Sequence, residues 1–426
     1  MQIIHNSKVK ETLYIEKLKN GLTVMIIPKK NVQKKYIIWG TNYGSNDSSF
    51  IVPGEDKVTN VPKGVAHFLE HKMFEQKNGR NSLDVLTEIG VSANAYTTND
   101  HTAYLYECTD NFYEALDEFM DYVQNPYFTD ENVEKEKGII GQEIMMYDDY
   151  PEWKVYLNAL EAMYHENPVK LDITGTIETI KEINKDILYK CYNTFYHPSN
   201  MVMVVSGDFE PENLLEEIKK RLLPVEPRGE IKRIYPEEPE SIVKEKVEQK
   251  MEVSRPLYAI GIKLKLLSDL KSEEIVRKNI IVQILLNLLL GESSQIYKKL
   301  YDSGNISYSP VMDFEFSKTY AHILISGQAE EPEVLYNELK KQINNFKKGN
   351  IKKEDFQRLK KTLYGEYVKE YNDVSEIARM FLVDYFKGVN SFEYLEQIES
   401  VQYEEILQTL NEYFDENKMV LSVVKA

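Results

Sequence analysis

The sequence contains few of the residues that would stabilise a small secreted protein or hold a chain in a membrane. Its 426 residues include two cysteines, Cys108 and Cys191, too few for a disulfide framework, so we expect a reducing compartment and two thiols that act as small apolar residues. The first eight residues lack the apolar core of a signal peptide. The longest apolar run, residues 280–290, contains Gln283 and Asn287 and is too short to span a bilayer. These absences predict a soluble, cytoplasmic protein.

Positive charge is also scarce. The chain has 52 lysines and arginines against 69 aspartates and glutamates, a net charge of −17. A surface of this sign argues against nucleic acid or an anionic membrane as a partner. Apolar material is ample, since 42% of residues are hydrophobic and 11% are aromatic. A chain of this length is too long for one ordinary domain and suits two domains of about 200 residues each.

The most informative motif is His67-Phe68-Leu69-Glu70-His71. On a helix, positions i and i+4 lie on the same face, so both imidazoles could reach one metal ion. The Glu70 carboxylate would lie near that face and could take a proton from a metal-bound water. Residues that favour a helix here are Pro62, Gly64, Leu69, Met73 and Phe74. The alternative is a His-Glu-His cluster on a solvated face, because a five-residue pattern can arise by chance.

A third ligand is available on a second predicted helix, residues 130–146. Glu136 and Glu143 are seven residues apart, so they project from nearly the same stripe of that helix. The apolar side of the helix is expected to carry Ile139, Ile140, Ile144 and Met146. Two carboxylates beside isoleucines are poorly explained by solubility alone. The alternative, a solvated acidic run, fits Glu131 and Glu134 better than Glu143.

The inverted His-x-x-Glu-His motif, with Glu143 downstream and Glu136 seven residues before it, resembles the M16 family of pitrilysin-like metallopeptidases, the inverzincins. Other stretches that resemble this family are residues 64–66, 93–97, 102–104, 196–208 and 290–308. The resemblance runs from near residue 20 to the C-terminus. It is nearest to the short M16B type found in bacteria, including the YmfH-like processing-protease group.

The resemblance implies an α/β (α+β) fold of two homologous M16-type domains, each a mixed, mainly antiparallel sheet packed with helices. The expected division is a metal-binding peptidase domain at 1–228, a linker at 229–249, and a second domain without the metal motif at 250–426. A proline- and charge-rich stretch near residues 225–250 supports the linker. A weak internal repeat supports two similar halves, since residues 201–205 resemble residues 419–423.

The same resemblance implies a zinc-dependent endopeptidase that hydrolyses unfolded peptides or short protein segments. His67, His71 and Glu143 would hold Zn²⁺, and Glu70 would activate the bound water. Glu136 would orient a ligand histidine or balance charge. Zinc follows from the family and from the nitrogen–oxygen ligand set, while manganese and cobalt stay open.

The substrate contacts are also carried over from the family. Its substrate adds as an extended strand beside an edge strand, here residues 92–96, with Asn94 and Ala95 as candidate contacts; the alternative for them is an ordinary strand turn. The family's second domain supplies an arginine and, seven residues later, a tyrosine that stabilises the developing oxyanion. Tyr308 occupies the tyrosine position and Tyr301 the arginine position. Tyr308 could instead be a core aromatic residue.

Tyr301 leaves the role of the isolated chain open. A phenol replaces neither the fixed charge nor the forked donors of a guanidinium. A chain with the metal motif but without this arginine resembles one subunit of the M16B heterodimers, in which one subunit brings the metal and a paralogue brings the arginine–tyrosine pair. We therefore expect a homo- or heterodimer. The alternative function is a weakly catalytic or non-catalytic interaction subunit with a mainly structural metal, although such a site has no need of Glu70. Nothing in the sequence favours a non-peptide substrate.

Overall fold

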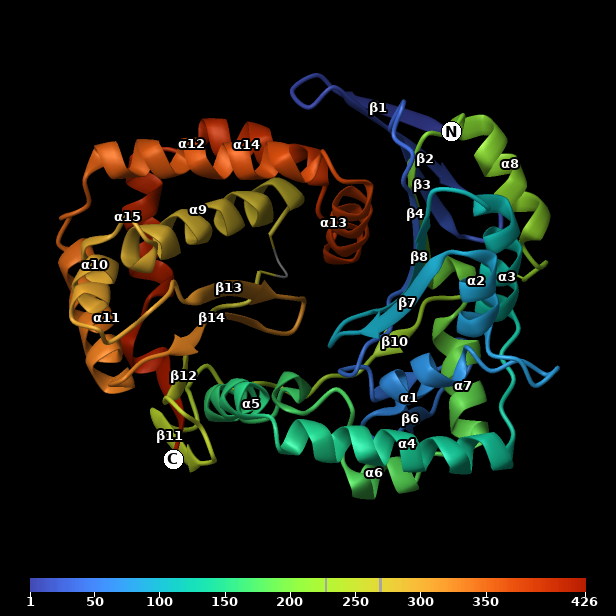
Figure 1. Cartoon of the computed structure of the whole chain (residues 1–426), viewed down its shortest axis with the longest axis horizontal. Helices are drawn as coiled ribbons and strands as arrows, with labels where there is room; N and C mark the ends of the chain where they lie inside the picture. The colour runs from blue at the N-terminus through green and yellow to red at the C-terminus, as the bar shows by residue number, and fades with distance from the viewer. Residues whose placement is uncertain (227, 268–269) are drawn as a thin grey trace. The chain divides into compact units, whose positions relative to one another are not determined.

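The computed structural model describes residues 1–226, 228–267 and 270–426 of the chain (Figure 1). These residues form two compact units, and neither unit is continuous in the sequence. The first comprises Met1–Ile144, Asp172–Tyr235 and Lys369–Ser391, and the second comprises Met145–Leu171, Pro236–Val368 and Phe392–Ala426. The contiguous division into 1–228, 229–249 and 250–426 stays a prediction, since the compact units interleave along the chain.

The first unit is built on a seven-stranded sheet. Its strands in spatial order are β1 (Gln2–Asn6), β2 (Glu11–Lys17), β3 (Thr23–Pro28), β9 (Met201–Gly207), β4 (Lys35–Thr41), β8 (Thr102–Cys108) and β7 (Ser92–Thr97). Only β3 and β9 pair in parallel among these strands; the other neighbours are antiparallel. Strand β9 is buried along its whole length, as expected for a strand covered on both faces. Among the described residues, strand β7 pairs only with β8 and forms one edge of the sheet.

Helices and a small sheet complete the first unit. The helices are α1 (Val65–Lys72), α2 (Ser82–Ile89), α3 (Phe112–Gln124), α4 (Asp130–Asp148), α6 (Ile177–Lys181), α7 (Lys185–Phe195), α8 (Pro211–Arg221) and α13 (Val374–Lys387). The small sheet consists of β10 (Lys232–Arg233), β5 (Ser49–Ile51) and β6 (Val58–Asn60). Helix α4 continues past the end of the first unit at Ile144.

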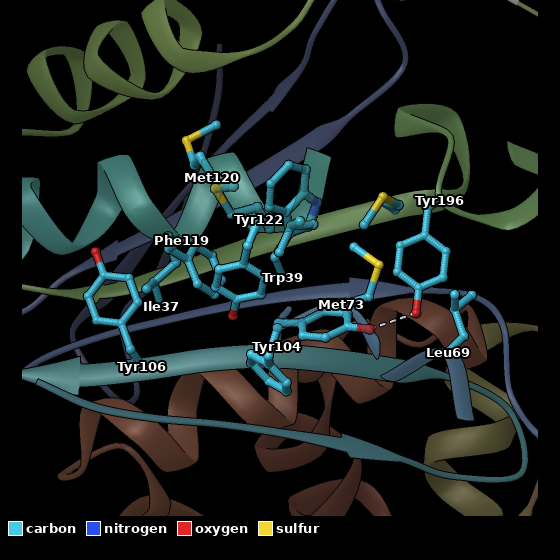
Figure 2. Packing of buried hydrophobic residues seen from close by; sticks show 14 of the residues in the cluster. Ile37, Trp39, Leu69, Met73, Tyr104, Tyr106, Phe119, Met120, Tyr122 and Tyr196 are labelled. Atoms are coloured by element: carbon cyan, nitrogen blue, oxygen red, sulfur yellow. Dashed lines mark hydrogen bonds between the residues drawn. The ribbon is translucent and has the colours of Figure 1, made fainter. Parts of the chain in front are cut away.

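The core of the first unit fixes the position of α1. Figure 2 shows Leu69 and Met73 among the aromatic residues of this core, and both are fully buried. Beside them the hydroxyls of Tyr104 and Tyr196 form a hydrogen bond of 2.8 Å. The apolar residues of α1 are therefore packed in this core, and the helix also carries His67 and His71, one turn apart.

The second unit has a five-stranded sheet. Its strands in spatial order are β11 (Lys246–Lys250), β15 (Met419–Lys425), β12 (Leu257–Lys263), β14 (Ala321–Gln328) and β13 (Val311–Phe316). Its helices are α5 (Pro151–Met163), α9 (Ser272–Leu290), α10 (Gln295–Asp302), α11 (Pro332–Lys347), α12 (Lys353–Glu370), α14 (Tyr394–Ser400) and α15 (Tyr403–Tyr413). By length and composition the stretch Ser272–Asp302 could cross a membrane, but 67% of its apolar window is buried inside the protein, as in a core helix.

The two sheets repeat one pattern of strands. The series β3-β9-β4-β8-β7 and the series β11-β15-β12-β14-β13 each begin with a parallel pair and continue with antiparallel pairs. The repeat noticed in the sequence falls on β9 and β15, which hold equivalent places. The expected fold class, α/β with two similar halves that each contain a mixed and mainly antiparallel sheet, is confirmed.

Each sheet is also covered by a helix from the other half of the sequence. Helix α13 packs against β4 and β9, and α5 packs against β12 and β15. A glycine lies under each helix: a Cβ at Gly40 would be 2.9 Å from Leu382 and Phe386, and one at Gly261 would be 2.6 Å from Met163. Gly40 pairs with Val202 of β9 and Gly261 with Val420 of β15, which are equivalent register positions. This exchange of helices is why the compact units interleave.

Candidate metal centre

Helix α1 places the two histidines of the motif side by side. It begins after Gly64, whose φ of 88° lies in the left-handed region that glycine adopts without strain. A Cβ at this position would lie 2.4 Å from the backbone oxygen of Thr174, so no larger residue fits. One helical turn then brings the rings of His67 and His71 to a centroid separation of 4.5 Å.

Glu143 of α4 faces both imidazoles. Its Oε1 lies 3.7 Å from Nε2 of His67 and its Oε2 lies 3.6 Å from Nε2 of His71. One ligand atom from each of these three residues lies within 4.8 Å of the others, and no other such group occurs in the part of the chain that the structure describes. Two imidazole nitrogens and one carboxylate oxygen form the donor set of a catalytic zinc site with an open position. The three residues predicted to bind metal are therefore together, and their arrangement fits zinc.

The protonation of these groups suits a cation. Burial, followed by the nearby His71, lowers the pKa of His67 to about 3, so this imidazole is neutral and its lone pair is available. Burial alone would lower the pKa of His71, but the hydrogen bond with Glu136 and the surrounding carboxylates outweigh it and raise that pKa. Burial raises the pKa of Glu143 despite the opposing effect of His71. A bound divalent cation would favour the neutral imidazoles and the ionised carboxylate.

Glu136 contacts the ring nitrogen of His71 that does not face Glu143. Its Oε1 lies 3.1 Å from Nδ1 of His71, and because a carboxylate can only accept, Nδ1 carries the proton and Nε2 is left to face Glu143. Burial opposes ionisation of Glu136, yet the contacts with His71 and Lys72 prevail and lower its pKa. Its position agrees with the expectation that it orients a ligand histidine.

Glu70 lies beside the three candidate ligands His67, His71 and Glu143 but is not one of them. Its Oε2 accepts a hydrogen bond of 2.6 Å from Oγ1 of Thr97, the last residue of β7. Burial raises the pKa of Glu70, while Thr97 and His71 act in the opposite direction. A buried carboxylate with a raised pKa, next to a group that could hold a metal, is suited to accept a proton.

The edge strand ends at this same point. Asn94 and Ala95 lie on β7, the unpaired edge of the first sheet, which agrees with a strand-addition site and contradicts the simple turn. The Ala95 N–H donates to Oδ1 of Asn94 at 2.9 Å, so an incoming strand that used this N–H would displace the Asn94 side chain. Their role in substrate binding stays a prediction.

The exposure of Tyr308 excludes one alternative for it, and the exposure of two residues on α4 corrects the predicted apolar face of that helix. Tyr308 is 47% exposed, which excludes the core-aromatic alternative; it lies in the second unit, as does Tyr301, which is 53% exposed and stacks on Tyr297. On α4, Ile140 and Ile144 are buried as expected, but Ile139 and Met146 are exposed. The apolar face of α4 is therefore narrower than predicted, since 139 and 146 lie on the side of the helix turned away from the core.

Sequence reasoning missed two residues that touch the site. Thr97 ends the stretch 93–97 that resembles the family, and the contact of its hydroxyl with Glu70 is not predicted by the sequence pattern. Lys72 directly follows the motif and contacts Glu136. The signal available for Lys72 was a charged residue between His71 and the apolar pair Met73-Phe74, where a buried partner is needed.

Comparison with known proteins gives consistent matches. Residues 57–177 match the family profile described as "Insulinase (Peptidase family M16)", and residues 182–363 match one described as "Peptidase M16 inactive domain". The "uncharacterized zinc protease YmfH" of Bacillus subtilis is 37% identical over 99% of this chain and 98% of its own length.

Solved structures agree with the sequence matches. A putative M16-like peptidase from Alicyclobacillus acidocaldarius superposes with a TM-score of 0.93 at 32% identity, covering 98% of this chain and 99% of the other. A protease from Helicobacter pylori shares the fold, with a TM-score of 0.84 at 20% identity over 97% of this chain and 99% of the other.

Proposed function

Because the chain belongs to the M16 family of peptidases, we propose that it is a zinc-dependent endopeptidase acting on unfolded peptides or short protein segments. The observation that carries the proposal is the convergence of His67, His71 and Glu143 beside a separate buried carboxylate, Glu70. A metal that only stabilised the fold would not need Glu70, which is not one of the three candidate ligands.

In the proposed mechanism His67, His71 and Glu143 hold the metal. When bound, zinc would supply a Lewis acid and would lower the pKa of water at the site toward about 7. Glu70 accepts the proton of the attacking water at its carboxylate and later passes it to the leaving amine. Thr97 fixes one oxygen of Glu70, and Glu136 fixes the ring of His71, so both groups are oriented before substrate arrives.

The substrate would bind along β7. This strand has one unpaired edge, which can accept the backbone of an extended peptide through main-chain hydrogen bonds with little demand on its sequence. Because Thr97 ends β7 and contacts Glu70, a peptide in register with Asn94 and Ala95 would lie near the base. Only an extended segment can pair in this way, which is why the proposed substrates are unfolded. We propose a cytoplasmic location, from the sequence composition alone.

A second candidate is supported by Tyr301, which stands where the family has an arginine. On this proposal the chain is the metal-bearing subunit of an M16B heterodimer, or an interaction subunit whose metal is mainly structural, and a paralogue supplies the arginine–tyrosine pair. The exposed position of Tyr301 leaves room for a partner's side chain. The two candidates differ in the activity of the purified chain.

Replacing the base tests the catalytic proposal. Glu70→Gln should retain zinc, because Glu70 is not a ligand, while peptide hydrolysis falls by about 10²–10⁴-fold. Glu131→Gln, at an exposed position of α4, is the matched control and should hydrolyse peptides at the wild-type rate. Unchanged turnover in Glu70→Gln would refute the central step, and a wild type without activity under any condition would favour the interaction subunit.

Replacing a ligand tests the metal site separately. His71→Ala should purify folded but contain far less than one zinc per chain, measured by elemental analysis alongside circular dichroism. Stoichiometric zinc in a folded His71→Ala protein would remove His71 from the site.

A further inference from the structure

Lys72, the last residue of α1, is fully buried, with 0% of its side chain exposed. A lysine is almost never buried to this extent without a partner, because its ammonium group loses hydration. It follows His71 in the sequence and precedes Met73, which points into the core shown in Figure 2. Its position between the candidate metal centre and the core is therefore one at which an apolar residue would ordinarily be expected.

The partners of Lys72 are both carboxylates. Its Nζ lies 2.7 Å from Oε1 of Glu75 and 3.5 Å from Oε2 of Glu136. Glu75 is partly exposed, whereas Glu136 is buried. The buried ammonium group thus compensates a buried carboxylate that would otherwise be taken out of water without a full counter-charge.

Glu136 uses its two oxygens for different partners. Oε1 contacts Nδ1 of His71, and Oε2 faces Nζ of Lys72. A carboxylate held at both oxygens cannot rotate about its terminal bond, so the direction of the hydrogen bond to His71 is fixed. The other histidine has no equivalent support, because Nδ1 of His67 is buried without a hydrogen-bond partner among the described residues. Of the two candidate ligand histidines, only His71 therefore has its ring orientation fixed by a hydrogen bond to Nδ1 among the described residues.

We propose that Lys72 is a positioning residue for the metal centre: its ammonium group fixes Glu136, and Glu136 in turn keeps Nε2 of His71 directed at the metal. This rests on the proposed zinc site. Lys72 touches neither metal nor substrate and acts only through Glu136. A lysine that merely filled the border of the core would affect the stability of the fold and leave zinc affinity unchanged.

The test is the zinc affinity of the full-length protein, measured by competition with a chromophoric chelator. Lys72→Met removes the charge and keeps an apolar stem of similar length. We expect it to weaken zinc binding by about 10–100-fold, the effect typical of losing a partner behind a metal ligand. Lys63→Met is the matched control: this partly buried lysine just before α1 contacts Ser48 rather than Glu136, and its replacement should leave zinc affinity unchanged.

A double mutant separates positioning from a structural role. Glu136→Gln should weaken zinc binding to a similar extent, and the double variant Lys72→Met/Glu136→Gln should bind no more weakly than the weaker single variant, because both changes break one chain of contacts. The absorption spectrum of the Co²⁺-loaded protein should change in Lys72→Met and stay as in the wild type in Lys63→Met.

Several results would overturn the proposal. Wild-type zinc affinity in a folded but less stable Lys72→Met protein would make Lys72 structural, and additive losses in the double variant would exclude action through Glu136. If Lys72→Met does not fold, Lys72→Gln, which keeps N–H donors without the charge, replaces it. Wild-type zinc affinity in a folded Lys72→Gln protein would likewise make Lys72 structural. A wild-type protein that binds no zinc would instead refute the proposed function, and the inference with it.

Discussion

The Thr97 hydroxyl joins the edge strand to the candidate base. Its Oγ1 lies 2.6 Å from Oε2 of Glu70 and 3.2 Å from Oγ1 of Thr102 on the next strand. Because the hydroxyl donates to the Glu70 carboxylate, it favours the ionised form that a general base needs. The strand proposed to bind substrate and the group proposed to take the proton are thus connected through one side chain.

Thr97→Val should shift the pH dependence of hydrolysis. Valine preserves the shape but removes the hydrogen bond that helps lower the pKa of Glu70, so this pKa, already raised by burial, should rise further. Since the base must be ionised, kcat/KM falls as pH drops through that pKa, and the acidic limb of the profile should move to higher pH in the variant. The control Thr87→Val, at an exposed site on α2, should leave the acidic limb of the pH profile unchanged. An unchanged acidic limb in Thr97→Val would show that Thr97 does not affect the pKa of the base.

At this scale the sequence predicted the residues whose spacing is local. The pair His67 and His71 follows from one helical turn, and the pair Glu136 and Glu143 follows from two. The sequence does not predict the contacts of Lys72 and Thr97, because these contacts join α1 to α4 and α1 to β7. No periodicity within one segment specifies which side chains meet across two elements.

At the scale of elements, the exchanged helices depend on close approach at two equivalent glycines. A Cβ at Gly40 would meet Leu382 and the ring of Phe386 at 2.9 Å, and the aromatic ring has little freedom to move aside. The substitution must therefore displace α13 or strain the sheet.

Gly40→Ala should lower the free energy of unfolding by about 1–3 kcal/mol, the usual effect of overpacking. Gly365→Ala is the control, because this helical glycine in α12 has open space around it and alanine there should stabilise by about 0.5–1 kcal/mol. Chemical denaturation of both variants measures the difference. Equal stability of Gly40→Ala and the wild type would show that α13 does not need the glycine.

The segment expected to be a linker, residues 229–249, makes contacts in both units. Lys232 and Arg233 form β10 and pair with β5 in the first unit. In the second unit, the Glu238 carboxylate accepts hydrogen bonds from the backbone N–H groups of His165, Glu166 and Asn167 at 2.9, 2.8 and 2.7 Å. It also pairs with the buried Lys263.

Glu238→Gln should destabilise the protein in a pH-dependent way. Burial opposes ionisation of Glu238, but Lys263 and the three N–H groups prevail and lower its pKa below the ordinary 4.5. Its contribution is therefore present above about pH 4.5 and is lost as pH falls through the lowered value. Wild type and variant should differ by about 1.5–3 kcal/mol at neutral pH, and the difference should shrink on acidification. A pH-independent difference in denaturation would exclude the charge as the cause.

The strands were predicted more closely than the arrangement of helices. The expected edge strand at 92–96 falls on β7, and the apolar runs repeated at 201–205 and 419–423 fall on β9 and β15, because continuous apolar runs are local signals. The exchange of α5 and α13 was not predicted. An amphipathic helix shows that one face is buried, but its sequence does not name the sheet that covers it.

At the scale of the whole molecule, the activity of the isolated chain tests whether it needs a partner, because Tyr301 occupies the position of the family's arginine. On the heterodimer proposal, the purified chain should bind zinc yet hydrolyse peptides feebly, since the loss of one oxyanion contact costs about 10²–10³ in rate. Adding a paralogue that carries the arginine should restore the rate, and adding more of the same chain should not. Full activity in a preparation free of other proteins would refute the heterodimer and favour a homodimer.

The exchanged helices also bear on how the protein is made. The first unit's sheet is complete once residue 207 has been synthesised, but α13, which covers β4 and β9, begins only at Val374. A nascent or truncated chain that stops before this helix leaves an apolar sheet face uncovered, which is the kind of surface that aggregates or recruits chaperones. The sheet of the first unit is therefore expected to be fully covered only after residues 374–387 have been synthesised.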